Sequence, residues 1–383
     1  MVLRRCGAMP VLNNMKLLII DSYYPAFLRS FYSAHPDLAN RSYDEQRRTL
    51  MDECFGTADF YSANLSALGH EATEVVANCE PLQQRWAREN GVKLGKWVVG
   101  RRGGLVPWPQ RRQSKDWFYT VLAAQVKNYR PDVLHIQDMN ETSAAFLREI
   151  RPYVKLITGQ IACPISSAAD FREYDLVLSS LPHFVKQFQS DGLRSEYFKL
   201  GFEPRLLERL EKGSRRRIVF IGGLSNDHAE RIEFLERLAA SHPVDIWGYG
   251  LESLSENSVL RQFHHGELWA LEMYQVLAGA DIALNHHINV ADAYANNMRL
   301  YEATGVGTLL LTDQKDNLST LFEPGKEVVA YSSAEEALEL VDYYLGHEEE
   351  RQEIARAGQA RTLREHTYYY RMQEFVDIID RYL

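Results

Sequence analysis

The sequence predicts an α/β protein with two doubly wound parallel sheets. Short apolar runs alternate with helical stretches along most of the 383 residues, and this alternation is typical of parallel strands joined by helices. A charged segment at 203–217, which carries Pro204 and Gly213, interrupts the alternation. A second series of apolar runs begins after it, so we interpret this segment as the connection between two domains.

The predicted organisation has five parts. Residues 1–14 contain basic residues but no long apolar core, which is a poor match to a signal peptide. We expect this segment to be disordered or extended. The other four parts are a first Rossmann-like domain at 15–203, a linker at 204–216, a second Rossmann-like domain at 217–367 and a final helix at 368–383.

Composition excludes several classes of protein. The formal net charge of −9, from 43 basic and 52 acidic residues, argues against wide nucleic-acid binding. The four cysteines form no CxxC pair, so we expect reduced thiols in a cytoplasmic protein. No apolar run approaches the ~18–20 residues of a membrane span. The oligomeric state stays open.

In the first half, apolar runs predict strands at 16–21, 70–78, 132–137, 155–162, 174–180 and 195–202. Helices are predicted at 59–68, 82–91 and 116–129, each ending near Gly or Pro. Residues 21–56 and 97–109 are interpreted as long loops, the first rich in aromatics and the second in Gly and Pro. Tyr23 and Tyr24 form either a wall of a binding site or part of the core.

In the second half, strands are predicted at 217–223, 243–250, 280–285, 308–312 and 327–333. Helices are predicted at 228–242 and 297–307. The chain from 333 to its end is predicted to be helical, with breaks at Gly346 and Gly358.

The stretch NHHINVADAYANNMRLYEATGVGTLLLTD, residues 285–313, is the centre of the prediction. It reads as strand, polar loop, helix and strand, which places the loop at the carboxyl edge of a parallel sheet, where ligands bind. Arg299 and Glu302 share one helix face and can pair with phosphate and with sugar hydroxyls. The neutral polar groups nearby are Asn285, His286, Asn296 and Asn297. A helix cap and a simple ion pair remain the alternative.

Two other motifs carry candidate chemistry. Gly222 and Gly223 lie between a strand and a helix whose first turn holds His228 and Arg231, an arrangement that favours phosphate. Tyr249, in the sequence WGYG, can stack on a base. The alternatives are a plain tight turn and ordinary packing.

In LHIQDMN, His135 and Asp138 lie at a strand end, and either can act as a general base if it faces an interdomain cleft. Gln160 ends the next strand and belongs to the same predicted wall. A structural role for the histidine is the alternative. The sequence contains no HExxH, no GxSxG and no carboxylate run with metal-ligand spacing, so no metal site is predicted.

The pattern NxRxxEATGVGTLLLTD at 297–313, together with FIGG, HAER and the C-terminal stretch at 343–372, resembles GT-B glycosyltransferases. More narrowly, it resembles bacterial CgeB-like enzymes related to family 4. The resemblance is dense from 217 to 372 and thin before it. It implies a GT-B fold whose last helix crosses back onto the first domain.

The resemblance also implies a donor, a UDP- or GDP-sugar held by the second domain, and an acceptor approached from the first. By position, Gly222 and Gly223 would lie beside the diphosphate, Arg299 would neutralise it, and Glu302 would take the ribose hydroxyls. Transfer would need no metal. Many family-4 enzymes carry a glutamate where this chain has Tyr294. The departure leaves the donor-sugar contact and the retaining or inverting outcome open.

The hypothesis is therefore a glycosyltransferase that moves a sugar from a nucleoside-diphosphate donor to a hydroxyl acceptor, which is a glycan, a small molecule or a protein. Tyr23, Tyr24 and Gln160 would lie on the acceptor side, and His135 or Asp138 would be the base. The alternatives are a sugar-nucleotide epimerase or hydrolase of the same fold, and a non-catalytic scaffold.

Overall fold

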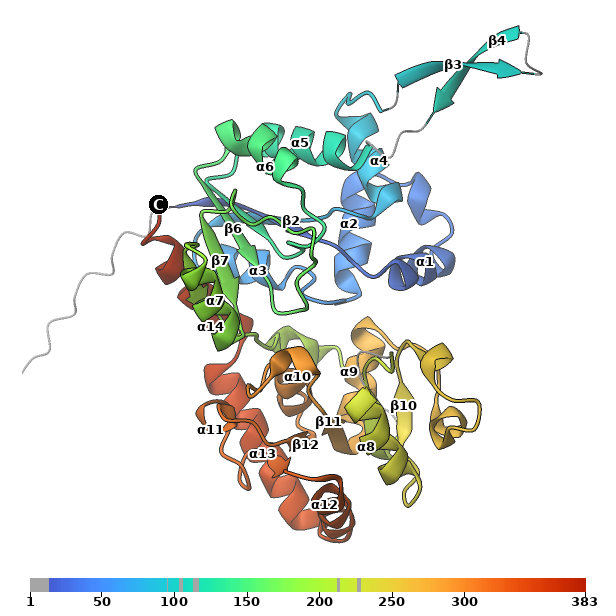
Figure 1. Ribbon diagram of the computed structural model, residues 1–383, viewed down its shortest axis with the longest axis vertical. Helices are drawn as coiled ribbons and strands as arrows, with labels where there is room; N and C mark the ends of the chain where they lie inside the picture. The colour runs from blue at the N-terminus through green and yellow to red at the C-terminus, as the bar shows by residue number, and fades with distance from the viewer. Residues whose placement is uncertain (1–13, 95, 103–105, 113–116, 212–213, 226–228) are drawn as a thin grey trace, which may run out of the picture.

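The computed structural model describes residues 14–94, 96–102, 106–112, 117–211, 214–225 and 229–383. The chain forms two α/β domains that stand one above the other (Figure 1). Each contains one parallel sheet, and the predicted strand positions are confirmed in both.

The first sheet has six parallel strands in the order β2-β1-β5-β6-β7-β8. Their bounds are β1 Lys16–Asp21, β2 Glu71–Val76, β5 Val133–Ile136, β6 Leu156–Gln160, β7 Leu176–Ser179 and β8 Ser195–Tyr197. Alternate residues of β1 pack on opposite faces, Leu17 and Ile19 in one apolar cluster and Leu18 and Ile20 in another. Burial on both faces explains why these strands read as continuous apolar runs.

Helices cover both faces of this sheet. Their bounds are α1 Pro25–Ala34, α2 Tyr43–Asp52, α3 Phe60–Ala67, α4 Glu80–Glu89, α5 Trp117–Tyr129, α6 Ala144–Ile150 and α7 Pro182–Ser190. Phe60 and Tyr61 of α3 pack on the Leu17 side, whereas Leu122 of α5 and Phe146 of α6 pack on the Leu18 side.

The prediction of a long loop at 21–56 is wrong, because most of this segment forms α1 and α2. Pro25 stands at the first helical position of α1, where its missing N–H has no cost. Ser42 and Glu45 form a capping box at the start of α2. The S-x-x-E pattern is visible in the sequence, but the density of aromatics outweighed it in the prediction.

The loop predicted at 97–109 is also wrong. β3 (Lys96–Arg102) and β4 (Val106–Arg112) form an antiparallel hairpin that projects from the first domain (Figure 1). Valine favours strands, and Pro107 and Pro109 are tolerated because both strands of a two-stranded ribbon are edges.

The second sheet has five parallel strands in the order β10-β9-β11-β12-β13. The strands are β9 Arg216–Ile221, β10 Asp245–Trp247, β11 Ala280–Asn285, β12 Leu309–Asp313 and β13 Val329–Tyr331. The helices are α8 Ala229–Ala239, α9 Ala270–Ala278, α10 Arg299–Gly305 and α11 Leu318–Leu321. Short 3-10 turns include η3 at Pro204–Glu208 and η7 at Asn289–Ala291.

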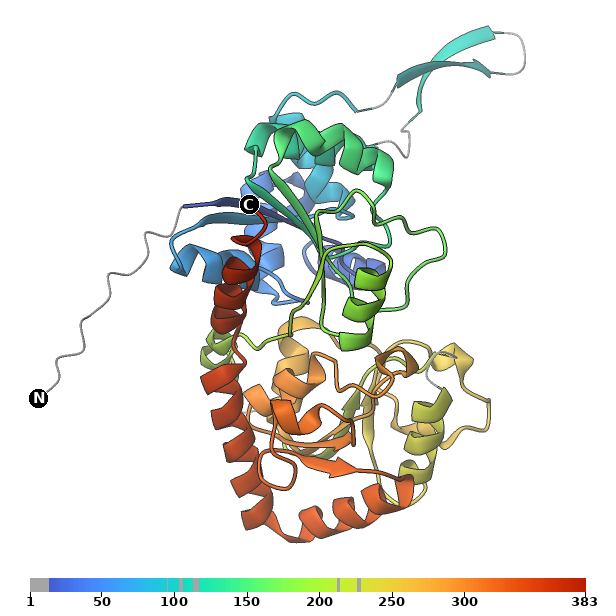
Figure 2. The ribbon, with the colours of Figure 1, turned by 60° about the vertical axis from the view of Figure 1, so that its left-hand side comes forward.

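Three helices end the chain: α12 Ala334–Gly346, α13 Glu348–Glu365 and α14 Tyr368–Ile379. α13 runs along the second domain, and α14 continues onto the first (Figure 2). The predicted break at Gly346 is confirmed, but the break at Gly358 is wrong. Gly358 lies inside α13, where a Cβ atom would stand 2.3 Å from the carbonyl oxygen of Glu327. Glycine there permits close packing rather than ending the helix.

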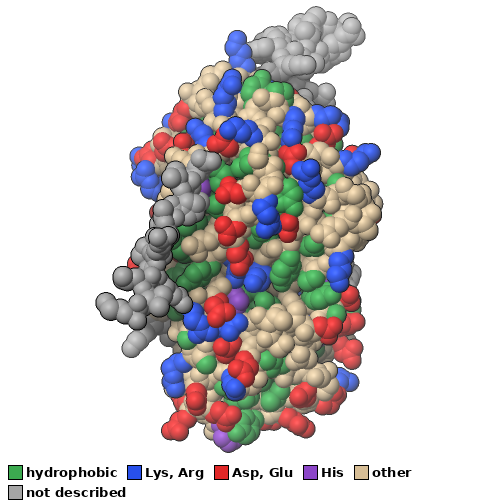
Figure 3. Space-filling view, turned by 90° about the vertical axis from the view of Figure 1, so that its left-hand side faces the viewer, with side chains coloured by type: hydrophobic (Ala, Val, Ile, Leu, Met, Phe, Trp, Pro, Cys, Tyr) green, Lys and Arg blue, Asp and Glu red, His purple; other side chains and the backbone are tan. Residues whose placement is uncertain are grey.

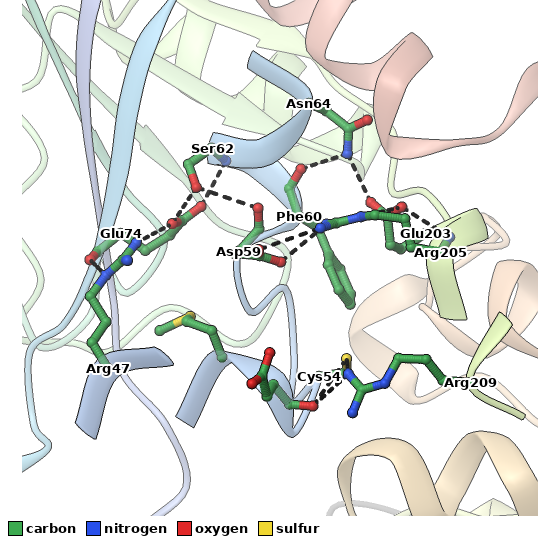
Figure 4. A network of polar contacts seen from close by, with 12 residues as sticks. Arg47, Cys54, Asp59, Phe60, Ser62, Asn64, Glu74, Glu203, Arg205 and Arg209 are labelled. Atoms are coloured by element: carbon green, nitrogen blue, oxygen red, sulfur yellow. Dashed lines mark hydrogen bonds and ion pairs between the residues drawn. The ribbon is translucent and has the colours of Figure 1, made fainter. Parts of the chain in front are cut away.

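The chain crosses between the domains twice, side by side. Phe202 N donates to His366 O at 2.8 Å, and Tyr368 N donates to Phe202 O at 2.9 Å. Beside this double crossing, Arg205 donates to Asp59, the residue before α3, and to Glu203, and Asn64 of α3 donates to Glu203 (Figure 4). Glu203 is buried, so these hydrogen bonds satisfy a carboxylate that would be costly to leave unpaired.

The surface carries mixed charge. Lys and Arg side chains are interspersed with Asp and Glu over the face that spans both domains (Figure 3). In the described part of the chain, no helix combines the length and the apolar character needed to cross a membrane.

Candidate functional site

A cavity of about 600 Å³ lies between the two domains, at the carboxyl ends of β1 and β6. Both domains contribute to its wall. Six residues singled out in the sequence line it: Tyr24, Gln160, Arg231, Asn296, Asn297 and Glu302.

Arg231 of α8 is a buried cation in this wall. It is 7% exposed, and its guanidinium donates to the carbonyl oxygens of His286, at 2.8 and 3.1 Å, and of Gly223, at 3.0 Å. Burial lowers its pKa to about 10, so the side chain stays charged at neutral pH. No ion pair joins it to a carboxylate of the described residues. A buried cation held only by neutral groups favours an anionic ligand.

Gly222 and Gly223, which follow β9, are not among the described residues that line the cavity. Gly222 N donates to Trp247 O at 2.9 Å, so this amide is not available to a phosphate as the motif suggested. The turn after β10 packs tightly against it: at Gly248, whose φ is +151°, a Cβ would meet Gly222 O at 1.9 Å. The glycines of WGYG therefore permit a close approach of two turns. Tyr249 is 42% exposed, and its ring centroid lies 6.3 Å from that of Tyr24.

Arg299 and Glu302 are joined to each other. Arg299 Nη1 lies 2.8 Å from Glu302 Oε2, and Arg299 Nη2 donates to Ile221 O at 3.1 Å. Burial raises the pKa of Glu302, opposed by the charge of Arg299 and by the Tyr274 hydroxyl, which donates at 3.4 Å. The simple ion pair considered for these residues is thus present, although it is buried rather than at the surface. Glu302 lines the cavity, and Arg299 stands behind it.

Two asparagines fix the start of α10. Asn285, at the end of β11, donates to Thr312 Oγ1 at 2.9 Å and accepts from Asn297 Nδ2 at 2.7 Å. Asn297 Oδ1 in turn accepts from Leu300 N at 3.2 Å. Asn297 therefore acts as a cap, as the alternative interpretation held, and it also lines the cavity.

His286 faces a different cavity. This second cavity, of about 520 Å³, lies over the ends of β12 and β13 and includes Asp313, Lys315 and Arg237. His286 Nδ1 is 3.0 Å from the Tyr331 hydroxyl, which donates to Asn285 O. Because that hydroxyl proton is used, Nδ1 carries the ring proton. Burial lowers the pKa of His286, so the ring is neutral.

Asp21 is a cavity residue that the sequence reasoning missed. It is the last residue of β1 and accepts from Ser22 N at 2.7 Å. Burial raises its pKa to about 7; the Ser22 hydrogen bond opposes this shift, and the charge of Asp138 adds to it. Asp138 does not line the cavity, and its Oδ1 accepts from Glu141 N at 3.4 Å. A carboxylate ending the first strand was the available signal.

His135 does not face the cavity. It is fully buried, its Nδ1 is 2.9 Å from Thr158 Oγ1, and its ring stacks on Tyr61 at 5.8 Å. Burial lowers its pKa to about 4. β5 is a central strand covered on both faces, so a side chain in its middle lies in the core. This position corrects the expectation that His135 reaches an acceptor.

Tyr23 is likewise a core residue, 2% exposed, whose hydroxyl contacts Met51 Sδ at 3.8 Å. Tyr24, its neighbour, is 51% exposed at the cavity. The core alternative therefore holds for Tyr23. His228 lies outside the described residues.

Tyr294 belongs to a docking loop, residues 288–295, that reaches from the second domain to the first. Val290, Ala291 and Tyr294 pack in the first domain's apolar cluster, and the Tyr294 ring stacks on His183 of α7 with centroids 5.7 Å apart. Asn317 anchors the loop by hydrogen bonds to both backbone groups of Ala295. The departure from the family-4 pattern thus places a domain contact where a glutamate was expected.

Within the described residues, no group of three or more His, Cys, Asp or Glu side chains is arranged to hold a metal ion.

The architecture is that of GT-B glycosyltransferases. Over 96% of this chain it matches sucrose-phosphate synthase from Thermosynechococcus elongatus (TM-score 0.56, 11% identity, 99% of that chain). It also matches Anabaena HepE solved with UDP and glucose (0.56, 13%, 96% and 100%). A glycosyltransferase from Rickettsia africae matches similarly (0.56, 11%, 97% and 99%). Identity this low establishes the fold alone.

The model of a family described as glycosyl transferase-like matches residues 230–377, which run from α8 into α14 and include Arg231, Arg299 and Glu302. No curated protein matches the sequence.

Proposed function

We propose that this protein is a glycosyltransferase that moves a sugar from a nucleoside-diphosphate sugar, a UDP- or GDP-sugar, to a hydroxyl group of an acceptor. The observation that carries the proposal is Arg231, a buried cation whose hydrogen-bond partners are backbone carbonyls, in the wall of an interdomain cavity. Its charge is available to a diphosphate. The glycosyl transferase-like family match covers this helix, and HepE, a fold neighbour, was solved with UDP-glucose.

In this proposal the second domain holds the donor. Arg231 stabilises the charge that develops on the leaving diphosphate, as a cation held in a fixed position does. The hydroxyl groups of the nucleotide sugar form hydrogen bonds with three polar side chains that line the same wall, those of Asn296, Asn297 and Glu302. Transfer is proposed to need no metal ion.

The first domain supplies the group that receives the acceptor proton. We assign this role to Asp21 in place of His135, because Asp21 lines the cavity and its pKa of about 7 is matched to proton transfer near neutral pH. In this proposal Asp138 is a neighbouring negative charge that raises the pKa of Asp21.

The test is thermal unfolding with UDP, GDP, ADP, CMP and dTDP, each with and without EDTA. Binding at ligand concentrations of 100 Kd stabilises the fold by about 2.7 kcal/mol. One diphosphate is expected to raise the Tm in EDTA. Arg231→Lys, which keeps the charge but loses the planar fork, is expected to reduce the shift. Arg237→Ala is the matched control, because Arg237 lies on the same helix and pairs with Glu335 at the surface.

Incubation with the matching nucleotide sugar then separates the alternatives. Sugar transferred to an added alcohol identifies a transferase, and free sugar without acceptor identifies a hydrolase. Binding without any turnover would identify a scaffold. No Tm shift with any nucleotide would overturn the proposal.

A further inference from the structure

The two walls of the interdomain cavity differ in chemistry. The first-domain wall carries a carboxyl, amides and hydroxyls, namely Asp21, Ser22, Thr57, Tyr61, Gln137 and Gln160. Among the described residues that line the cavity, the positively charged one is Arg231, which comes from the second domain. In the part of the chain that the structure describes, the side on which the acceptor is expected therefore presents no cation of its own.

The amides of this wall are held in place. Thr57 Oγ1 donates to Gln137 Oε1 at 2.9 Å, and Tyr61, a buried hydroxyl, donates to Gln160 Oε1 at 3.0 Å. Amides held in fixed positions recognise ligands whose groups both donate and accept hydrogen bonds, as sugar hydroxyls do.

The cavity also carries an aromatic surface. Tyr24 is 51% exposed, and its ring meets Phe55 and Trp269 edge to face, with centroids 5.7 and 5.2 Å apart. All three line the cavity. An exposed tyrosine backed by two further aromatic rings is suited to a ligand ring that offers an apolar face while its edges are polar.

The first-domain wall offers an anion no opposite charge. Among the described residues that line the cavity the cation is Arg231, which the proposed function assigns to the diphosphate of the donor. A phosphate or carboxylate on the acceptor would therefore lose water without gaining a positively charged partner, which is costly.

We propose that the acceptor is an uncharged sugar whose apolar face lies against Tyr24 and whose hydroxyl groups bind Asp21, Gln137 and Gln160. This inference rests on the proposed function and names the substrate of the same site. In the transfer, the acceptor oxygen forms a bond to the anomeric carbon of the donor, and its proton passes to Asp21. The bond from the anomeric carbon to the diphosphate breaks, and the nucleoside diphosphate leaves with the electron pair.

The test is ligand-observed NMR with UDP present. The probes are methyl glycosides of glucose, galactose, mannose and N-acetylglucosamine, each compared with its 6-phosphate or its uronic acid. At least one neutral glycoside is expected to bind and its charged counterpart is not. Tyr24→Ala should weaken binding by about tenfold, as loss of a buried aromatic contact does, and Tyr24→Phe should retain it. Tyr343→Ala, at an exposed tyrosine of α12, is the control.

Stronger binding of a charged counterpart overturns the inference, and so does binding that ignores Tyr24→Ala. If UDP binds but no neutral glycoside does, the acceptor inference fails while the donor site stands. If a glycoside binds in a Tyr24-dependent manner but no nucleotide does, the proposed function fails while the sugar site stands.

Discussion

Arg299 and Glu302 neutralise each other at the base of the interdomain cavity, with 2.8 Å between Nη1 and Oε2 and side-chain exposures of 13% and 7%. The resemblance to family-4 enzymes assigns the two residues to different parts of the donor. Here they form one unit, in which the guanidinium also holds Ile221 O at the end of β9.

Removing one partner of this buried pair should destabilise the fold more than removing both. Glu302→Gln leaves the Arg299 charge uncompensated and is expected to cost about 3 kcal/mol of unfolding free energy. The double variant Arg299→Met with Glu302→Gln should cost less than Glu302→Gln alone. Urea unfolding of the four proteins measures the coupling. Strict additivity would show that the pair contributes nothing as a unit.

Asp21 predicts a pH dependence of turnover. The carboxylate is active as a base only when ionised, so kcat/KM should rise with pH and level off above about 7, the pKa of this group in the fold. Asp21→Asn should lose turnover and retain UDP binding by thermal shift. A variant that keeps its turnover would remove Asp21 from the reaction.

The same group affects stability with a defined sign. Its pKa is about 7 in the folded protein against 3.8 for a free side chain. Between these values the folded state holds more protons than the unfolded state, so this group makes stability fall as pH rises. Asp21→Asn should flatten that part of the curve of unfolding free energy against pH. A steeper curve in the variant would contradict the assigned environment.

A substitution in the docking loop is expected to open the two domains. Tyr294→Ala removes the stack on His183, which is a contact between the domains. The cavity should open, and X-ray scattering should report a larger radius of gyration. Tyr343→Ala, with an exposed ring on α12, should leave the radius unchanged. Identical scattering from all three proteins would show that Tyr294 does not hold the domains together.

Two glycines near the C-terminus should respond oppositely to alanine. At Gly358 the new Cβ would meet Glu327 O at 2.3 Å, whereas at Gly346 it would meet nothing within 4 Å. Gly358→Ala is expected to destabilise by about 1–3 kcal/mol through overpacking. Gly346→Ala should be neutral or stabilise by up to about 1 kcal/mol. Equal Tm values for the two variants would contradict this packing.

The sequence predicted the sheets better than the connections. Strands that are buried on both faces, such as β1 and β12, appear in the sequence as continuous apolar runs, and this pattern is typical of parallel sheets covered by helices. The helices of residues 25–52 were missed because the many aromatic residues were interpreted as a binding loop, although Phe27, Leu28 and Phe31 have helical spacing and Ser42 and Glu45 marked a helix start. Gly358 was misread because a glycine required by tertiary packing looks the same in sequence as one that ends a helix.

The candidate site was predictable where it depends on strand ends and not where it depends on side-chain direction. Arg231, Asn297 and Glu302 were found because they follow strands at the carboxyl edge. His135 and Gln137 are two positions apart, yet one is in the core and the other lines the cavity. The difference arises because β5 ends at Ile136, between these two residues. A sequence predicts the end of a strand only to within a few residues.

The paired crossing at Phe202 and His366 has a consequence for modularity. The whole second domain enters and leaves the first through neighbouring backbone positions, joined by the hydrogen bond from Phe202 N to His366 O. It is therefore an insertion between β8 and α14, in the manner of a cassette whose two ends meet. If the proposed function holds, a different nucleotide-binding cassette with equally close ends would change the donor while the sheet that carries Asp21 stays continuous, so donor choice and acceptor choice are expected to change independently.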